Sequence, residues 1–117
     1  MDEETKRLVC RMVAGLVASD EEFTESEREF VERVLTQFDI PKDEWDAIYP
    51  LVDPEEAQAE IARLNGRARE VTIDLLVQAA AADGKIADEE LAYLQAVAKA
   101  MSVHQSVIEY RLRAAMQ

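Results

Sequence analysis

The chain has 117 residues, of which 49% are hydrophobic, and 25 acidic residues against 13 lysines and arginines give it a net charge of −12. A chain of this length and composition is expected to form one domain, over 1–117, with a core that needs no disulfide or metal. The charge argues against binding to nucleic acid or anionic lipid, and a single cysteine without a secretory leader or long apolar stretch predicts a cytoplasmic protein.

The first half of the chain is predicted to hold three helices. The first covers 3–18. Apolar residues recur along it at three- and four-residue steps and form one stripe: Leu8, Val9, Met12, Val13, Leu16 and Val17. Cys10 and Gly15 are expected beside this stripe. Thr24 followed by Glu27 is a capping box that opens the second helix, which is predicted to reach Gln37. Asp39-Ile40-Pro41 ends it, and a short helix follows over 42–48, with Trp45 and Ile48 buried.

Four more helices are predicted in the second half. A connector helix over 53–64 begins with Asp53 as cap and Pro54 as first residue, and Asn65-Gly66 is expected to end it. The next two cover 67–82 and 88–100. The last runs from Val103 or His104 to the end, and its expected buried side contains Val107, Ile108, Leu112 and Ala115. The prediction is an all-α fold of about seven helices.

A similarity between the two halves recurs at an offset of 63 residues. The offset matches Asp20 with Asp83 and Glu27 with Glu90, and it pairs apolar residues such as Phe30 with Tyr93. This pattern predicts an internal repeat, with halves over 8–49 and 67–116 joined by the connector helix over 53–64. The halves are expected to pack about an approximate twofold axis and to present their acidic turns to solvent.

Each acidic turn is a candidate cation site. Asp83-Gly84-Lys85-Ile86 with Glu90 matches the second half of an EF-hand loop, but Ala79 and Ala81 occupy two positions where calcium needs oxygen ligands, so the turn is not an EF-hand.

Clustered carboxylates still prefer calcium, magnesium or manganese. The predicted ligands are Asp83 and Glu90, with Asp20 and Glu27 as auxiliary ligands.

A structural interpretation of the same glutamates stands beside the cation site. In this interpretation Glu27 accepts hydrogen bonds from backbone amides in its capping box, and Glu90 does the same in its own turn. Ala87 occupies the position in the second half that Thr24 occupies in the first. The only histidine, His104, is expected to cap a helix or lie on the surface. Since no nucleophile, base and orienting group can be assembled, the sequence predicts no enzyme.

The motif from Ala81 to Glu90, followed by Leu94 and Val97, resembles the signature of TerB-like tellurite-resistance domains, which are related to the N-terminal domain of the DjlA co-chaperone. The resemblance spans roughly 8–112. It implies an all-helical domain of two repeated halves, an acidic surface that binds divalent metal, and a role in chemical stress.

Two functional hypotheses follow. In the first, a stress-associated TerB-like domain binds a divalent cation at its acidic turns. In the second, an acidic helical surface without a metal site binds a basic or helical protein partner. Self-association into a homo-oligomer is a third possibility.

Overall fold

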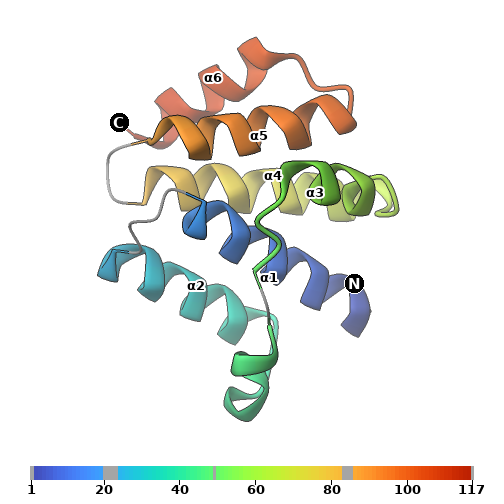
Figure 1. Ribbon diagram of the computed structural model, residues 1–117, viewed down its shortest axis with the longest axis vertical. Helices are drawn as coiled ribbons and strands as arrows, with labels where there is room; N and C mark the ends of the chain where they lie inside the picture. The colour runs from blue at the N-terminus through green and yellow to red at the C-terminus, as the bar shows by residue number, and fades with distance from the viewer. Residues whose placement is uncertain (1, 20–23, 49, 83–85, 117) are drawn as a thin grey trace.

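The computed structural model describes residues 2–19, 24–48, 50–82 and 86–116, and over these ranges the fold is all-α, as predicted (Figure 1). Six α-helices and one 3-10 helix, η1, follow one another, and no strand occurs in these ranges. In chain order they are α1 (Glu3–Ala18), α2 (Glu25–Gln37), η1 (Lys42–Ala47), α3 (Pro54–Ile61), α4 (Gly66–Ala81), α5 (Asp88–Ala100) and α6 (Gln105–Ala115).

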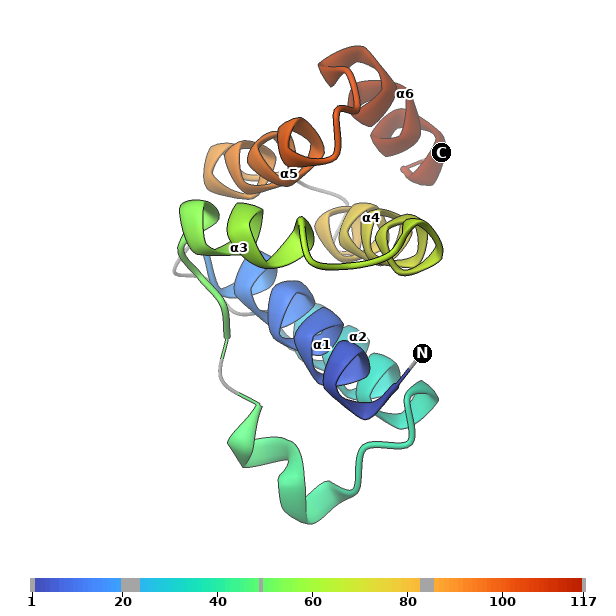
Figure 2. The same cartoon turned by 90° about the vertical axis from the view of Figure 1, so that its right-hand side faces the viewer.

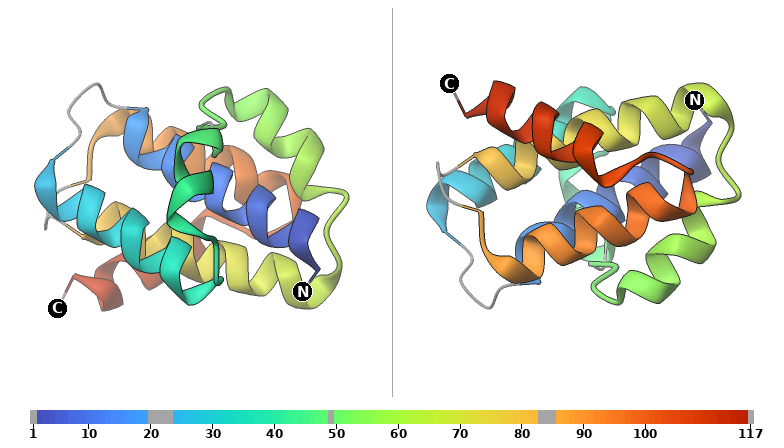
Figure 3. Two further views of the ribbon diagram at one scale, coloured as in Figure 1. Left: turned by 90° about the horizontal axis from the view of Figure 1, so that it is seen from below. Right: turned by 90° about the horizontal axis from the view of Figure 1, so that it is seen from above.

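Two helices, α1 and α4, form the centre of the bundle. They pack against each other; α2 lies along α1, and α5 and α6 both pack on α4 (Figures 1 and 2). The short α3 packs against α5, and seen from above α5 and α6 form the outer layer over α4 (Figure 3). The arrangement buries one face of each central helix on several neighbours.

Side-chain caps begin the helices where the sequence predicts. The Glu27 N–H donates to Thr24 Oγ1 (3.2 Å) and the Thr24 N–H donates to Glu27 Oε1 (3.0 Å), which confirms the capping box. Asp53 caps α3 by accepting the Glu55 N–H at 2.9 Å, with Pro54 as the first helical residue. Local chemistry alone is enough to place these helix starts.

The prediction for Asn65-Gly66 is wrong. The connector helix ends at Ile61 rather than near Leu64, and Asn65 begins the next helix by accepting the Ala68 N–H at 2.9 Å. Gly66 is the first residue of α4 and has no left-handed backbone. Asparagine and glycine serve both as helix stops and as helix starts, so their order here did not decide between the two.

The two halves have helices of matching position. Each bound of α1 and α2 lies 63 residues before the corresponding bound of α4 and α5. In both halves the second helix is followed, after its C-cap, by a left-handed residue: Asp39 (φ 57°) and Ser102 (φ 59°). The packing corresponds too, because α1 packs on α5 as α2 packs on α4. An internal repeat stays a prediction, but the structural correspondence gives each position of α1 and α2 an equivalent in α4 and α5.

After the left-handed residue the halves differ. The first half continues as η1, a 3-10 helix with Pro41 as its N-cap and Ile48 as its C-cap. Trp45 and Ile48 are partly buried, whereas the sequence predicts that they are buried. The second half continues as the longer α6, which packs back onto α4 and α5. Of the two central helices, therefore, only α4 is packed by the α-helix that follows the left-handed residue of its own half.

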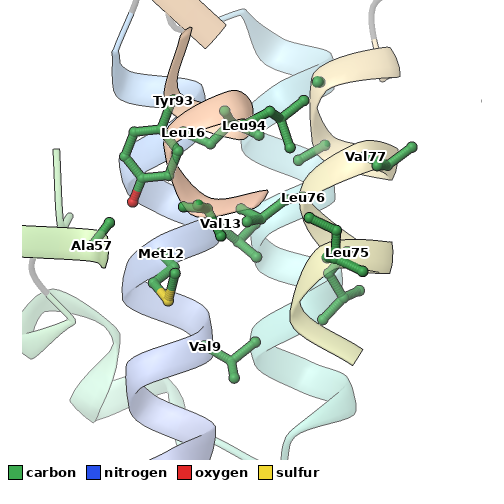
Figure 4. Packing of buried hydrophobic residues seen from close by; sticks show 14 of the residues in the cluster. Val9, Met12, Val13, Leu16, Ala57, Leu75, Leu76, Val77, Tyr93 and Leu94 are labelled. Carbon is green, nitrogen blue, oxygen red and sulfur yellow. The ribbon is translucent and has the colours of Figure 1, made fainter. Parts of the chain in front are cut away.

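The core lies where α1, α4 and α5 meet. Leu16, Leu76 and Leu94 are 0% exposed (Figure 4). Ile108 and Leu112 of α6 are buried as predicted, but Val107 and Ala115, expected on the same side, are exposed. The buried face of α6 is thus narrower than its apolar composition indicates.

Two residues placed beside the apolar stripe of α1 are in fact buried. Cys10 is 1% exposed, and burial raises the pKa of its thiol to about 12, so the thiol is protonated and unreactive at neutral pH. Gly15 is buried because the connector crosses α1 there: the Leu51 N–H donates to the Arg11 carbonyl at 3.0 Å. A Cβ on Gly15 would lie 2.0 Å from the Leu51 carbonyl oxygen.

The crossing is held from a second side by α5. The Tyr93 hydroxyl donates to the Leu51 carbonyl at 2.6 Å, and Tyr93 itself is 0% exposed. Figure 4 shows its ring beside Leu16, with the hydroxyl directed toward the side where Ala57 of α3 lies. Leu51 therefore joins α1 to α5 through its backbone, and only glycine at position 15 allows this approach.

Candidate functional site

The acidic turns are the site that the sequence predicts, and the structure places half of it. Asp20 and Asp83 lie outside the described residues. The sequence predicts that Glu27 and Glu90 face solvent, but both are buried, at 1% and 2% exposure. These two glutamates occupy equivalent positions in the first turns of α2 and α5.

Both glutamates bind backbone amides at the start of their helices. Glu27 Oε1 accepts the N–H and the hydroxyl of Thr24, each at 3.0 Å. Glu90 Oε1 accepts the Ala87 N–H at 3.2 Å, which is one half of a capping box, since Ala87 has no side-chain oxygen to complete it. The structural interpretation of the two glutamates is therefore confirmed, and it accounts for their burial at a helix N-terminus.

A cation site at the turns stays a prediction. The described ranges contain no group of three histidine, cysteine, aspartate or glutamate side chains placed to hold a metal ion. The proposed aspartate ligands lie outside those ranges, so any such site would combine Glu27 or Glu90 with groups in 20–23 or 83–85.

Titration calorimetry with calcium, magnesium and manganese tests that site. If the turns bind a cation, we expect saturable heat and a metal-dependent rise in melting temperature, because a ligand of the folded state stabilises it. Asp83→Asn combined with Glu90→Gln should abolish both signals. The absence of heat and of any thermal shift at millimolar metal would reject the cation site.

His104 has the local role predicted for it. It is the N-cap of α6, and its Nδ1 accepts the Ser106 N–H at 3.1 Å. The Ser106 hydroxyl lies 2.8 Å from the same nitrogen, and both residues are exposed. Because Nδ1 of His104 already accepts the Ser106 amide proton, we interpret His104 and Ser106 as a helix cap and not as a base with an activated serine hydroxyl.

A second candidate site, which sequence reasoning missed, is a groove along α4 between α2 and α6. One cavity of about 680 Å³ opens between α4 and α6, and another of about 390 Å³ opens between α4, α2 and the end of α6. Gln78 and Ala115 line both cavities, which makes the two a continuous surface. We call this surface the α4 face and define it by Phe30, Arg33, Val71, Asp74, Gln78 and Tyr110.

One large exposed apolar side chain, Tyr110, lies at the border of the α4 face. The exposed large hydrophobic residues of the described ranges are Val52, Val107, Tyr110 and Met116; the last three belong to α6 or its C-cap. Tyr110 lines the α4–α6 cavity and is 73% exposed. The spacing of Val107, Tyr110 and Ala114 marks a second stripe beside Ile108 and Leu112, which is the sequence signal that identifies this border.

The rim of the α4 face carries more acidic than basic groups. Glu29, Glu70 and Asp74 are exposed lining residues, whereas Arg33 and Arg111 supply the basic groups. The Arg33 guanidinium lies 5.6 Å from the centroid of the Phe30 ring, in a cation–π contact on its own helix. The face therefore combines an exposed tyrosine at its border with a mostly acidic rim.

Comparison with protein-family models, with curated proteins and with solved structures finds no match. The TerB-like resemblance thus rests on the turn motif alone. The helices of the described ranges are also too short or too polar to cross a membrane.

Proposed function

We propose that this chain is a non-enzymatic helical domain that binds a protein partner at the α4 face. The observation that carries the proposal is the position of Tyr110, which is 73% exposed on the border of a groove. Tyrosine is enriched among the residues that contribute most to protein interfaces, because it combines a large rigid apolar surface with a polar end.

Charge supports a basic partner. The net charge of −12 attracts positively charged protein surfaces and accelerates their association at low salt, while it repels nucleic acid. Glu70 and Asp74, which line the same cavity as Tyr110, put part of this charge beside the exposed tyrosine. Steering by the whole domain and recognition by the groove thus favour the same class of partner.

The family identity and the cation expected from the sequence remain separate proposals. A TerB-like identity and a link to tellurite stress rest on the motif from Ala81 to Glu90, and a divalent cation rests on the acidic turns. The α4 face offers no argument for either. A partner-binding role agrees with an accessory stress factor of the kind that the resemblance implies.

A pair of matched variants tests the function. Tyr110→Lys changes an exposed apolar residue on the α4 face, and Val52→Lys makes the same kind of change on the connector, at 45% exposure. Both should fold with stability within about 0.5 kcal/mol of the wild type, as most surface substitutions do.

The measurement is quantitative affinity isolation after crosslinking in cells that express the chain. We expect proteins that are recovered with the wild type and with Val52→Lys to be lost with Tyr110→Lys. Equal recovery with both variants would show that the α4 face does not bind the partner.

A further inference from the structure

The chain itself shows how a segment packs on the face equivalent to the α4 face. On the other half, the connector and α3 cover the surface formed by α1 and α5. Leu51 lies against Gly15, and its backbone bonds to the Arg11 carbonyl and the Tyr93 hydroxyl at 3.0 and 2.6 Å. Gln58 of α3 donates to the Ala96 carbonyl of α5 at 2.8 Å.

The positions equivalent to these four contacts lie together on the α4 face. At an offset of 63 residues, Arg11 and Gly15 correspond to Asp74 and Gln78 of α4, while Tyr93 and Ala96 correspond to Phe30 and Arg33 of α2. Asp74 and Gln78 line the cavity beside α6; Phe30, Arg33 and Gln78 line the cavity beside α2. The surface that holds α3 in one half is thus an open groove in the other.

Two basic residues of α1 have acidic residues at the equivalent positions of α4. Arg7 and Arg11 of α1 line a cavity with Glu60 of α3, and its lining also includes other charged residues of both signs: Asp2, Glu4 and Arg63. Arg7 forms its ion pair with Glu44, at 2.9 Å. The equivalents of Arg7 and Arg11 on α4 are Glu70 and Asp74, both exposed. Glu29, Glu70 and Asp74 outnumber Arg33 and Arg111 on the α4 face, and the whole domain has a net charge of −12, so complementarity favours a basic segment on the side of Glu70 and Asp74.

The α2 surface is also more polar than its equivalent on α5. Arg33 and Gln37 stand where α5 has Ala96 and Ala100. A polar groove surface is typical of an interface that forms and dissociates, whereas α5 packs against α3 within the chain and bonds to Gln58 through the Ala96 carbonyl. The difference favours an exchangeable occupant from another protein.

We propose that the α4 face receives a basic amphipathic helix of a partner protein, which lies against α2 as α3 lies against α5. The inference rests on the proposed function and names the partner's chemistry: small and aliphatic residues like Ala57 and Ile61 face the groove, and lysines or arginines face Glu70 and Asp74. Gln78 replaces Gly15, so the partner's backbone does not approach α4 as closely as Leu51 approaches α1.

A peptide built on α3 provides the probe. It has the sequence of residues 51–64 with Glu55→Lys, Glu56→Lys and Glu60→Lys, and the unchanged acidic sequence is its control. In fluorescence anisotropy at low salt, we expect the basic peptide to bind about tenfold more tightly than the acidic one, the effect of reversing a few partly exposed charges.

Two double variants of the protein locate the site. Glu70→Lys with Asp74→Lys reverses the charge of the α4 face and should remove the preference for the basic peptide. Asp43→Lys with Asp46→Lys makes the same change in net charge on exposed residues of η1 and should keep the preference. NMR shift changes on α2 and α4 should accompany binding.

Several outcomes would overturn this inference: no preference for the basic peptide, an equal loss with both double variants, or shift changes on α1 and α5, which would mean that the peptide replaces α3. Self-association that Glu70→Lys with Asp74→Lys abolishes would assign the face to a second copy instead. Failure of the peptide while Tyr110→Lys still loses partners would reject only this binding mode. Failure of both would reject the function as well.

Discussion

Replacing Gly15 by alanine is expected to lower the free energy of unfolding by about 3 kcal/mol, near the upper end of overpacking effects in cores. The new Cβ would lie 2.0 Å from the Leu51 carbonyl oxygen and 2.5 Å from its carbon, so the connector must move away from α1. That movement also breaks the bond from the Leu51 N–H to the Arg11 carbonyl. Urea unfolding followed by circular dichroism measures the loss.

The control is Gly66→Ala. A Cβ at Gly66 meets nothing within 4 Å, and the residue is the first of α4, so the variant should be neutral or stabilised by up to about 1 kcal/mol. Similar values for the two alanine variants would mean that the connector does not cross α1 at Gly15.

Tyr93→Phe probes the same crossing from α5. Removal of the hydroxyl leaves the buried Leu51 carbonyl without this donor, which should cost about 1–3 kcal/mol. In the Gly15→Ala background the cost should be smaller, because the displaced connector no longer presents its carbonyl to Tyr93. Strict additivity of the two changes would contradict a shared contact at Leu51.

Leu94→Ala is the second large effect that we expect, with a loss of about 2–5 kcal/mol. Leu94 is 0% exposed and lies in the core that α5 forms with α1 and α4 (Figure 4), so truncation removes apolar burial and leaves a cavity. Thermal and urea unfolding both report the change.

Glu89→Gln, on the exposed side of α5, is the matched comparison and should change stability by less than about 0.5 kcal/mol. A near-neutral Leu94→Ala would show that the buried face of α5 is assigned incorrectly.

Local signals predicted the helices well because the residues that set them are neighbours in sequence. Thr24 with Glu27, and Asp53 with Pro54, begin α2 and α3 as predicted, and α2 ends before the left-handed Asp39. Asn65-Gly66 was assigned to the wrong helix end, since both residue types occur at starts and stops.

The candidate sites were harder to predict. Two roles are predicted for Glu27 and Glu90, as cation ligands on exposed turns and as caps of their own helices. The structure confirms the caps, but the burial of both carboxylates is not predicted, because a charged side chain is buried only when specific partners bind it. The sequence does not predict that Tyr110 of α6 borders a groove. Val107 and Ile108 of the same helix are both apolar, and only the packing of α6 on α4 shows which side of the helix is covered.

The amino-acid sequence by itself determined that this protein is all-α and where most helices begin and end, because caps and the helical period act over a few residues. Only the tertiary structure decided that Leu51 crosses α1 at Gly15 and that α3 covers one half while the α4 face of the other remains a groove. Those features join residues far apart in the chain, and their energies depend on packing that no local pattern records.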